Sequence, residues 1–138
     1  MPPCIRTHCP SHKHSCHHYT CTLELRNRLE RRRSERDQLK AKLEADATIA
    51  INALRKLKES CNKPDRAYLS QARQKFEDQT SEGVSRLECF CVECAVEHKD
   101  REIASLRRRY RVLQTVQQAV ADVERQRRCR EKYKAMSS

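Results

Sequence analysis

Cysteine and histidine residues gather in two short stretches of the 138-residue chain, and both side chains are good zinc ligands. The more regular stretch reads Cys89-x-Cys91-x2-Cys94-x3-His98. Thiolates separated by two residues can hold one ion in a tight turn. His98 follows Cys94 by about one helical turn, so the two side chains share a face. The sequence therefore predicts a tetrahedral zinc site in this stretch, made of Cys89, Cys91, Cys94 and His98.

The first 21 residues hold four of the nine cysteines and five of the six histidines. The candidate ligands of a site in this segment are Cys9, His12, Cys16 and Cys21, with Cys4 and His14 as rivals. These ligands form either a site of their own or one shared with the second cluster, which would staple two helix starts together. A weakly metal-binding tail and a disulfide scaffold are the other interpretations.

The expected zinc is structural, and the protein is not expected to be an enzyme. A catalytic zinc ion keeps an open coordination position and usually has a carboxylate base nearby. Glu93 and Glu97 lie near the second cluster, but the chain carries no deaminase or metalloprotease motif. A single glycine, Gly83, also excludes Gly-rich phosphate-binding loops and dinucleotide-binding fingerprints.

The composition of the chain indicates which secondary-structure elements carry these two clusters. Hydrophobic residues make up 37% of the chain and charged residues 36%, with one Gly, four Pro and no Trp. All-β folds need many Gly- and Pro-rich turns, which this chain lacks. We therefore expect an all-α fold of long helices, in a coiled-coil or helical-hairpin arrangement stapled by Cys/His zinc sites. No apolar run is long enough for a secretory signal or a membrane span, so a reducing intracellular setting is expected.

Apolar spacing and breaker residues divide the chain into five segments. Thr22 is a suitable N-cap for the first long helix, and Asn62-Lys63-Pro64-Asp65 ends it. The expected segments are a Cys/His-rich zinc-binding segment over 1–21, a long basic helix over 22–61, a short helix over 65–80, the second zinc cluster over 84–98, and a coiled-coil helix with a basic end over 94–134.

The last helix carries a heptad pattern. Its repeating positions are Val96, Ile103, Leu106, Tyr110, Leu113 and Val120, with Val116 and Val123 beside them. Several heptads of this kind favour a coiled coil. Two uses stay open: a seam between two chains, giving a homodimer, or packing against the first long helix of the same chain.

The net charge of +11 is concentrated in arginine clusters. The predicted RNA-binding residues are Arg26, Arg28, Arg31, Arg32, Arg33 and Arg36 in the first helix and Arg107, Arg108, Arg109 and Arg111 in the last. Arginine suits bidentate phosphate contacts, and the scarcity of aromatic residues favours duplex backbone over stacked single strands. The alternative is a solvent-exposed helix face on which the arginines form ion pairs with nearby glutamates such as Glu30 and Glu35.

The stretches HCPSHKHSC and RNRLERRRSER, the second Cys/His cluster and the heptad C-terminus together resemble the small cysteine-rich RNA-silencing suppressor proteins of rod-shaped plant RNA viruses, the pecluviruses, hordeiviruses and furoviruses. The resemblance implies binding of small double-stranded RNA, zinc binding and coiled-coil self-association. It makes Cys9, Cys16 and Cys21 metal ligands and Arg26–Arg36 the RNA-binding motif. Pecluvirus proteins end in a Ser-Lys-Leu-type peroxisomal signal. This chain ends Lys-Ala-Met-Ser-Ser, so host-cell cytoplasm is the expected location.

The sequence thus predicts a zinc-stapled dimer that sequesters small double-stranded RNA, with host silencing proteins as further partners. The alternatives are a zinc-stabilised coiled-coil scaffold for protein interactions and a generic nucleic-acid-binding regulator. The first helix carries an apolar stripe that includes Leu25, Leu29, Leu39 and Leu43. Arg32 and Arg36 occupy the positions of this stripe between Leu29 and Leu39. A scaffold has no evident need of arginine there, which favours the RNA interpretation.

Overall fold

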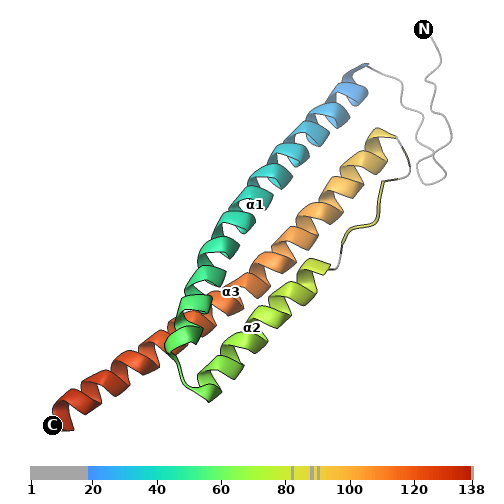
Figure 1. Ribbon diagram of the computed structural model, residues 1–138. Coiled ribbons are helices and arrows are strands. Elements are labelled where there is room, and N and C mark those ends of the chain that lie inside the picture. Colours follow the sequence, from blue (N-terminus) through green and yellow to red (C-terminus); the bar gives the residue numbers. More distant parts are fainter. Residues whose placement is uncertain (1–18, 82, 88, 90, 138) are drawn as a thin grey trace. The chain divides into compact units, whose positions relative to one another are not determined.

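The computed structural model describes residues 19–137 except 82, 88 and 90, and it describes the side chains of residues 23–79 and of the described residues from 83 onward. The described chain forms three helices, α1 (Tyr19–Ser60), α2 (Lys63–Ser81) and α3 (Val92–Ser137), and contains no strand (Figure 1). The prediction of an all-α fold is confirmed for this part of the chain.

All three helices begin two or three residues before the expected positions, α3 at Val92 where 94 was expected. α1 begins at Tyr19, so Thr22 lies inside its first turns and is not the N-cap. α2 begins at Lys63, before the expected start at Asp65, because Asn62 caps it: the Asp65 amide donates to Asn62 Oδ1 at 3.1 Å, and the Arg66 amide donates to the Asn62 carbonyl at 3.0 Å. Pro64 fits in this first turn, where its missing N–H is not needed.

The contacts within the chain define two compact units, and α1 and α3 each contribute to both. The first unit contains α1 up to Ala41 together with the stretch Gly83–Leu106. Its buried apolar side chains are Leu29, Val96, Ile103 and Leu106. In the first unit, one part of the contact between α1 and α3 is therefore apolar, and charged residues form the rest of that contact.

The second unit contains Lys42–Glu82 and Arg107–Ser138, that is, the end of α1, all of α2 and most of α3. Each helix contributes residues at spacings of three and four, which place them on one face. The buried residues are Leu43, Ala50, Leu54, Leu57 and Cys61, then Leu69, Ala72 and Phe76, then Leu113, Val116, Ala119, Val120 and Val123. The structure therefore gives this unit a conventional three-helix core.

The heptad positions of α3 are used inside the single chain. Five of the six predicted oligomerisation residues are buried there: Val96, Ile103, Leu106, Leu113 and Val120. Of the two uses left open by the sequence, intramolecular packing accounts for this burial. Self-association stays a prediction, and it needs either other residues or a separation of these helices.

The sixth heptad residue, Tyr110, joins α3 to α1 within the second unit. Its hydroxyl donates a hydrogen bond to Asp46 Oδ2, and Lys42 Nζ lies 5.3 Å from the centroid of its ring. The hydrogen bond to Asp46, with smaller contributions from burial and from the carboxylate charge, raises the pKa of the Tyr110 phenol above its usual 10.0.

This contact predicts a pH dependence at alkaline pH. A group whose pKa is higher in the folded chain stabilises the fold below its unfolded pKa, and that contribution is lost as the pH rises through the folded pKa. The free energy of unfolding should therefore fall above pH 10. Tyr110→Phe should flatten this fall, whereas Tyr68→Phe should not. Denaturant titrations from neutral to alkaline pH would measure it, and identical slopes in both variants and the wild type would contradict it.

Candidate nucleic-acid interface

The N-terminal candidate zinc ligands are not placed by the structure. Cys9, His12 and Cys16 lie outside the described residues, as does the side chain of Cys21. The arrangement of that segment, and its expected pairing with the second cluster, stay predictions.

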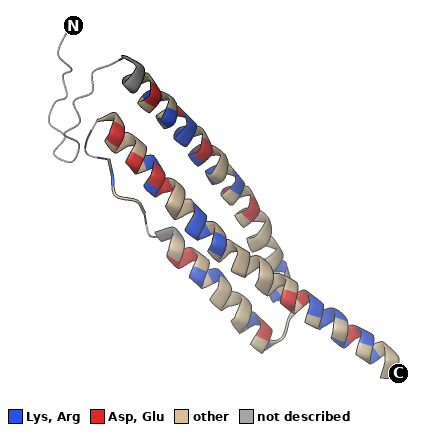
Figure 2. Ribbon diagram, turned by 180° about the vertical axis from the view of Figure 1, so that it is seen from behind, with Lys and Arg blue, Asp and Glu red and all other residues tan. Residues whose placement is uncertain are grey.

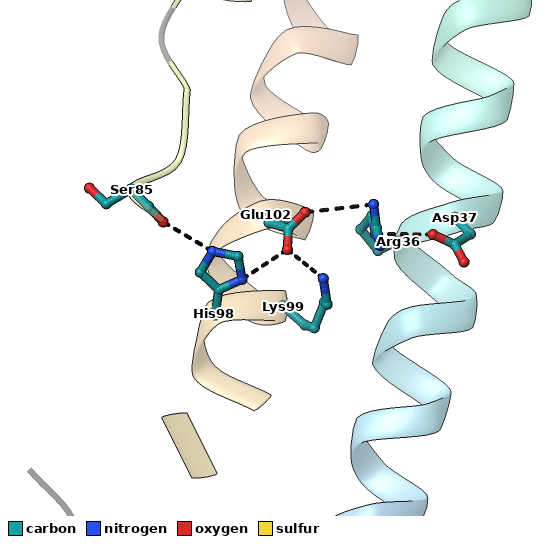
Figure 3. A network of polar contacts seen from close by, with 6 residues as sticks. All are labelled: Arg36, Asp37, Ser85, His98, Lys99 and Glu102. Atoms are coloured by element: carbon teal, nitrogen blue, oxygen red, sulfur yellow. Dashed lines mark hydrogen bonds and ion pairs between the residues drawn. The ribbon is translucent and has the colours of Figure 1, made fainter. Parts of the chain in front are cut away.

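The second cluster is described, and its side chains are not gathered around a common point. Among the described residues, which include Cys89, Cys91, Cys94 and His98, no three Cys, His, Asp or Glu side chains are grouped as a metal site would need. His98 faces other partners: its Nε2 donates to the Ser85 carbonyl at 3.0 Å, and its Nδ1 lies 2.9 Å from Glu102 Oε1 (Figure 3). For His98 to bind zinc, one ring nitrogen must leave its present contact.

Glu102 is the centre of this polar network in the first unit. Its Oε1 lies 2.7 Å from Lys99 Nζ, and its Oε2 lies 3.8 Å from Arg36 Nη1 of α1 (Figure 3). Partial burial by itself raises the pKa of Glu102. The hydrogen bond from Lys99 and the charges of Lys99, Arg36 and His98 outweigh burial, so the net effect lowers that pKa below its usual 4.5. A carboxylate held in its charged form can anchor several cations at once.

Arg32 and Arg36 reach across from α1 to acidic residues of α3. Arg32 Nε lies 3.0 Å from Asp100 Oδ1, and Arg36 pairs with Glu102. These two arginines occupy positions of the α1 stripe where an apolar residue is expected, and carboxylates of α3 lie opposite them. Their position in the stripe therefore has a structural reason, and it does not discriminate between RNA binding and a scaffold as the sequence suggested.

Arg36→Gln should be more destabilising than the same change at Arg31. Only 25% of the Arg36 side chain and 21% of the Glu102 side chain are exposed, so their attraction is screened less than that of a surface pair. We expect Arg36→Gln to lower the free energy of unfolding by about 1 kcal/mol and Arg31→Gln by less than about 0.5 kcal/mol. Urea unfolding of both variants, and of Glu102→Gln for a double-mutant cycle, measures the coupling. Zero coupling between Arg36 and Glu102 would contradict this assignment.

The other arginines of the first cluster are differently placed. Arg33 pairs with Glu30 on the surface of the same helix at 3.0 Å. Arg26, Arg28 and Arg31 are exposed, and none of them forms an ion pair within the described part of the chain. These three side chains are the ones in this cluster that can contact a phosphate without giving up a partner in the fold.

The arginine run of α3 divides in the same way. Arg108 and Arg111 are exposed. Arg109 is half-buried, and its Nε atom is enclosed without a hydrogen-bond partner. Arg107 is exposed and already has an interaction within the chain. Two of the four predicted residues, Arg108 and Arg111, are thus the best placed for an external anion.

The C-terminal end of α3 carries further basic residues, since Lys and Arg continue along this helix into its last turns (Figure 2). Two of them hold α3 to the α1–α2 connection: Arg127 donates to Ser60 Oγ at 2.7 Å, and Arg130 donates to Asp65 Oδ2 at 3.2 Å. Arg128 and Lys132 are exposed and form no ion pair among the described residues.

Five exposed basic residues of α3 lie on one broad side of the helix, and we call them the α3 basic face: Arg108, Arg111, Arg125, Arg128 and Lys132. Arg111, Arg125 and Lys132 are separated by multiples of seven residues, so they lie nearly in line. The face runs for about 36 Å at 1.5 Å per residue. An acid interrupts it at Asp122, which is neutralised by Arg125 at 3.0 Å. The sequence signal for Arg125, Arg128 and Lys132 was the basic composition of this end, but these residues were not among the predicted RNA contacts.

Comparison of the chain with family models, with curated proteins and with solved structures gives no match. Among the described residues, no helix is long and apolar enough to cross a membrane.

Proposed function

We propose that the protein binds double-stranded RNA through its phosphate backbone, using the α3 basic face of the second unit; Arg26, Arg28 and Arg31 of the first unit are a separate candidate surface. The observation that carries the proposal is the α3 basic face itself. It consists of five exposed cationic side chains on one broad side of α3, and only Arg125 has an ion-pair partner there. Proteins that read a duplex by shape contact its phosphates with cationic side chains of this kind.

The chemistry of the face favours a duplex over a single strand. Single strands are usually held by bases stacked on aromatic side chains. The basic stretches contain only Tyr110 and Tyr133, and Tyr110 is engaged by Asp46 and Lys42. Guanidinium groups without stacking partners gain most from phosphate oxygens, where they form charge-assisted hydrogen bonds.

A gel-shift series with single-stranded RNA, duplex RNA and duplex DNA of one length tests this proposal. Contact with the phosphates and the 2′-hydroxyl groups predicts the tightest binding for duplex RNA, with little effect of sequence. Equal affinity for RNA and DNA duplexes, or tighter binding of single strands, would contradict the assignment and leave a generic polyanion binder.

The proposed biological role is suppression of RNA silencing by sequestering small duplex RNA in the host cytoplasm. It is supported by the resemblance to the cysteine-rich proteins of rod-shaped plant RNA viruses and by the α3 basic face. In a silencing-reporter assay, loss of duplex binding should abolish suppression. Suppression by a variant that no longer binds duplex RNA would point instead to a direct contact with host silencing proteins.

Structural zinc remains part of the proposal, and the candidate donors are Cys89, Cys91, Cys94 and His98 together with Cys9, His12, Cys16 and Cys21 of the N-terminal segment. The chemistry of this donor set, thiolates with imidazoles, suits Zn²⁺. We expect at least one zinc ion per chain in reducing preparations, and chelation should lower the thermal unfolding temperature. Replacing Cys91 and Cys94 by Ser should reduce the zinc content, whereas Cys129→Ser should leave it unchanged. A metal content well below one zinc ion per chain would contradict the proposal.

The alternative function is a protein-interaction scaffold. It is favoured by an open groove of about 510 Å³ in the second unit, lined by residues of α1 and α3 including Asn52, Lys56 and Glu124. Ile49 lies at this groove and is 68% exposed. Self-association is proposed for either function, and sedimentation would determine the oligomeric state. A scaffold predicts that Ile49→Asp disrupts assembly while duplex binding is absent in the wild type.

A further inference from the structure

The last turns of α3 expose the two least covered large apolar side chains among the described residues. Tyr133 is 76% exposed and Met136 is 86% exposed. Cys129 is also exposed and lies four residues before Tyr133. Spacings of four and three residues put these side chains on one face, which we call the apolar strip: Cys129, Tyr133 and Met136.

Basic residues flank the apolar strip, and acidic residues lie away from it. Arg125, Arg128 and Lys132 line one side of the strip, and Arg130 lies on the other. Glu131 is two residues from both Cys129 and Tyr133, which places it about 200° round the helix. Glu124 lies seven residues before Glu131, on that same opposite side. The strip and its cationic border therefore form an amphipathic surface.

Two arginines hold this helix end within the second unit, Arg127 from the side opposite the strip and Arg130 from beside it. Arg127 contacts Ser60, and Arg130 contacts Asp65 at the start of α2. These contacts are made by residues outside the apolar strip, whose three side chains stay exposed. A surface held in this way needs no refolding to meet a partner.

Charge decides which partner fits. A second copy of the strip would bring two sets of arginine and lysine together, and like charges repel. The phosphates of a nucleic acid duplex would satisfy the basic border but would leave Tyr133 and Met136 in water. An anionic lipid surface satisfies both parts, because headgroups attract the basic side chains and the interfacial region accepts tyrosine and methionine.

We propose that residues 125–136 of α3 dock on an anionic membrane surface, with the apolar strip lying in the interface and Arg125, Arg128 and Lys132 contacting lipid phosphates and carboxylates. The attachment is peripheral, with the helix parallel to the surface. This inference does not depend on the proposed duplex binding, although the three basic residues belong to both surfaces.

Flotation of the full chain with lipid vesicles tests the inference. The wild type should bind vesicles of equal parts phosphatidylserine and phosphatidylcholine and should not bind vesicles of phosphatidylcholine alone. Tyr133→Ser/Met136→Ser should weaken binding by about tenfold or more, since the apolar contribution is lost. Arg128→Gln/Lys132→Gln should weaken it by about twenty-five-fold, at roughly fivefold for each basic residue near the surface.

Tyr68→Ser is the matched control, because Tyr68 is 46% exposed on α2 and lies outside the basic segment. It should leave vesicle binding unchanged. Circular dichroism should give the same helicity for all variants. Duplex binding separates the two proposals: Tyr133→Ser/Met136→Ser should leave it intact while vesicle binding falls. Failure of the wild type to bind anionic vesicles, equal binding to neutral vesicles, or unchanged binding of Tyr133→Ser/Met136→Ser would each overturn the inference, whatever the outcome with RNA.

Discussion

Replacing Leu113 by alanine is expected to lower the free energy of unfolding by about 2–5 kcal/mol. Leu113 is completely buried in the core of the second unit, as are Leu54 of α1 and Leu69 of α2. Removing its branched end leaves a cavity between packed helices that can close only in part. Urea denaturation of wild type and variant, at several protein concentrations, gives both the stability and its dependence on assembly.

The matched control is Ile49→Ala, which removes a similar aliphatic side chain from a position 68% exposed on α1. It should change the unfolding free energy by less than about 0.5 kcal/mol. If Leu113→Ala instead left the monomer as stable as before and abolished only a dimer, the heptad residues would form a seam between chains, and the intramolecular core would be incorrect.

Much of the helical architecture follows from spacing alone. Leu54 and Leu57 in α1 are three residues apart, Leu69 and Phe76 in α2 are seven apart, and all four are buried. The absence of glycine and proline within these stretches leaves the helix as the natural conformation. Periodicity on one helix identifies its apolar face without naming what covers it. For that reason the sequence left the use of the α3 heptads open.

The sequence could not show which arginines are paired within the fold and which are exposed, because it does not show what covers each helix face. Arg31 and Arg32 are neighbours in a basic run, yet Arg31 is exposed without an ion-pair partner among the described residues while Arg32 contacts Asp100 of α3. Which carboxylate faces which arginine depends on how two helices align, and a distance of 68 residues along the chain carries no signal of it. Composition predicts a basic surface, but only packing shows which charges remain available.

Where a side chain has two possible partners, sequence spacing cannot predict which one it contacts, and the second zinc cluster is an example. The spacing of Cys91, Cys94 and His98 suits a metal site. In the structure, His98 Nε2 instead donates to the Ser85 carbonyl at 3.0 Å, and His98 Nδ1 lies 2.9 Å from Glu102 Oε1 without forming a hydrogen bond. Glu102 lies four residues after His98 on α3, so a local helical contact competes with the metal for the imidazole.

Neutralising three arginines of the α3 basic face is expected to reduce affinity for duplex RNA by about one hundredfold. The variant is Arg108→Gln/Arg111→Gln/Arg128→Gln, and these side chains are exposed without an ion pair among the described residues. The estimate corresponds to roughly 1 kcal/mol for each charge-assisted phosphate contact that is lost. Because each neutralised phosphate releases counterions, the slope of log affinity against log salt should become shallower by about 2.7 if A-form duplexes behave as B-DNA does.

A second variant separates lost contacts from a lost fold. Arg32→Gln/Arg36→Gln removes two arginines that pair with Asp100 and Glu102, so it should lower stability and leave the salt slope nearly unchanged. The α3 variant should show the opposite pattern, with wild-type helicity and unfolding midpoint and uniformly weaker binding across unrelated duplex sequences. Fluorescence anisotropy over a series of salt concentrations measures both slopes. A shallower slope in Arg32→Gln/Arg36→Gln, together with wild-type binding by the α3 variant, would move the RNA-contacting surface from α3 to the first unit, because a phosphate contact is identified by the counterions it displaces.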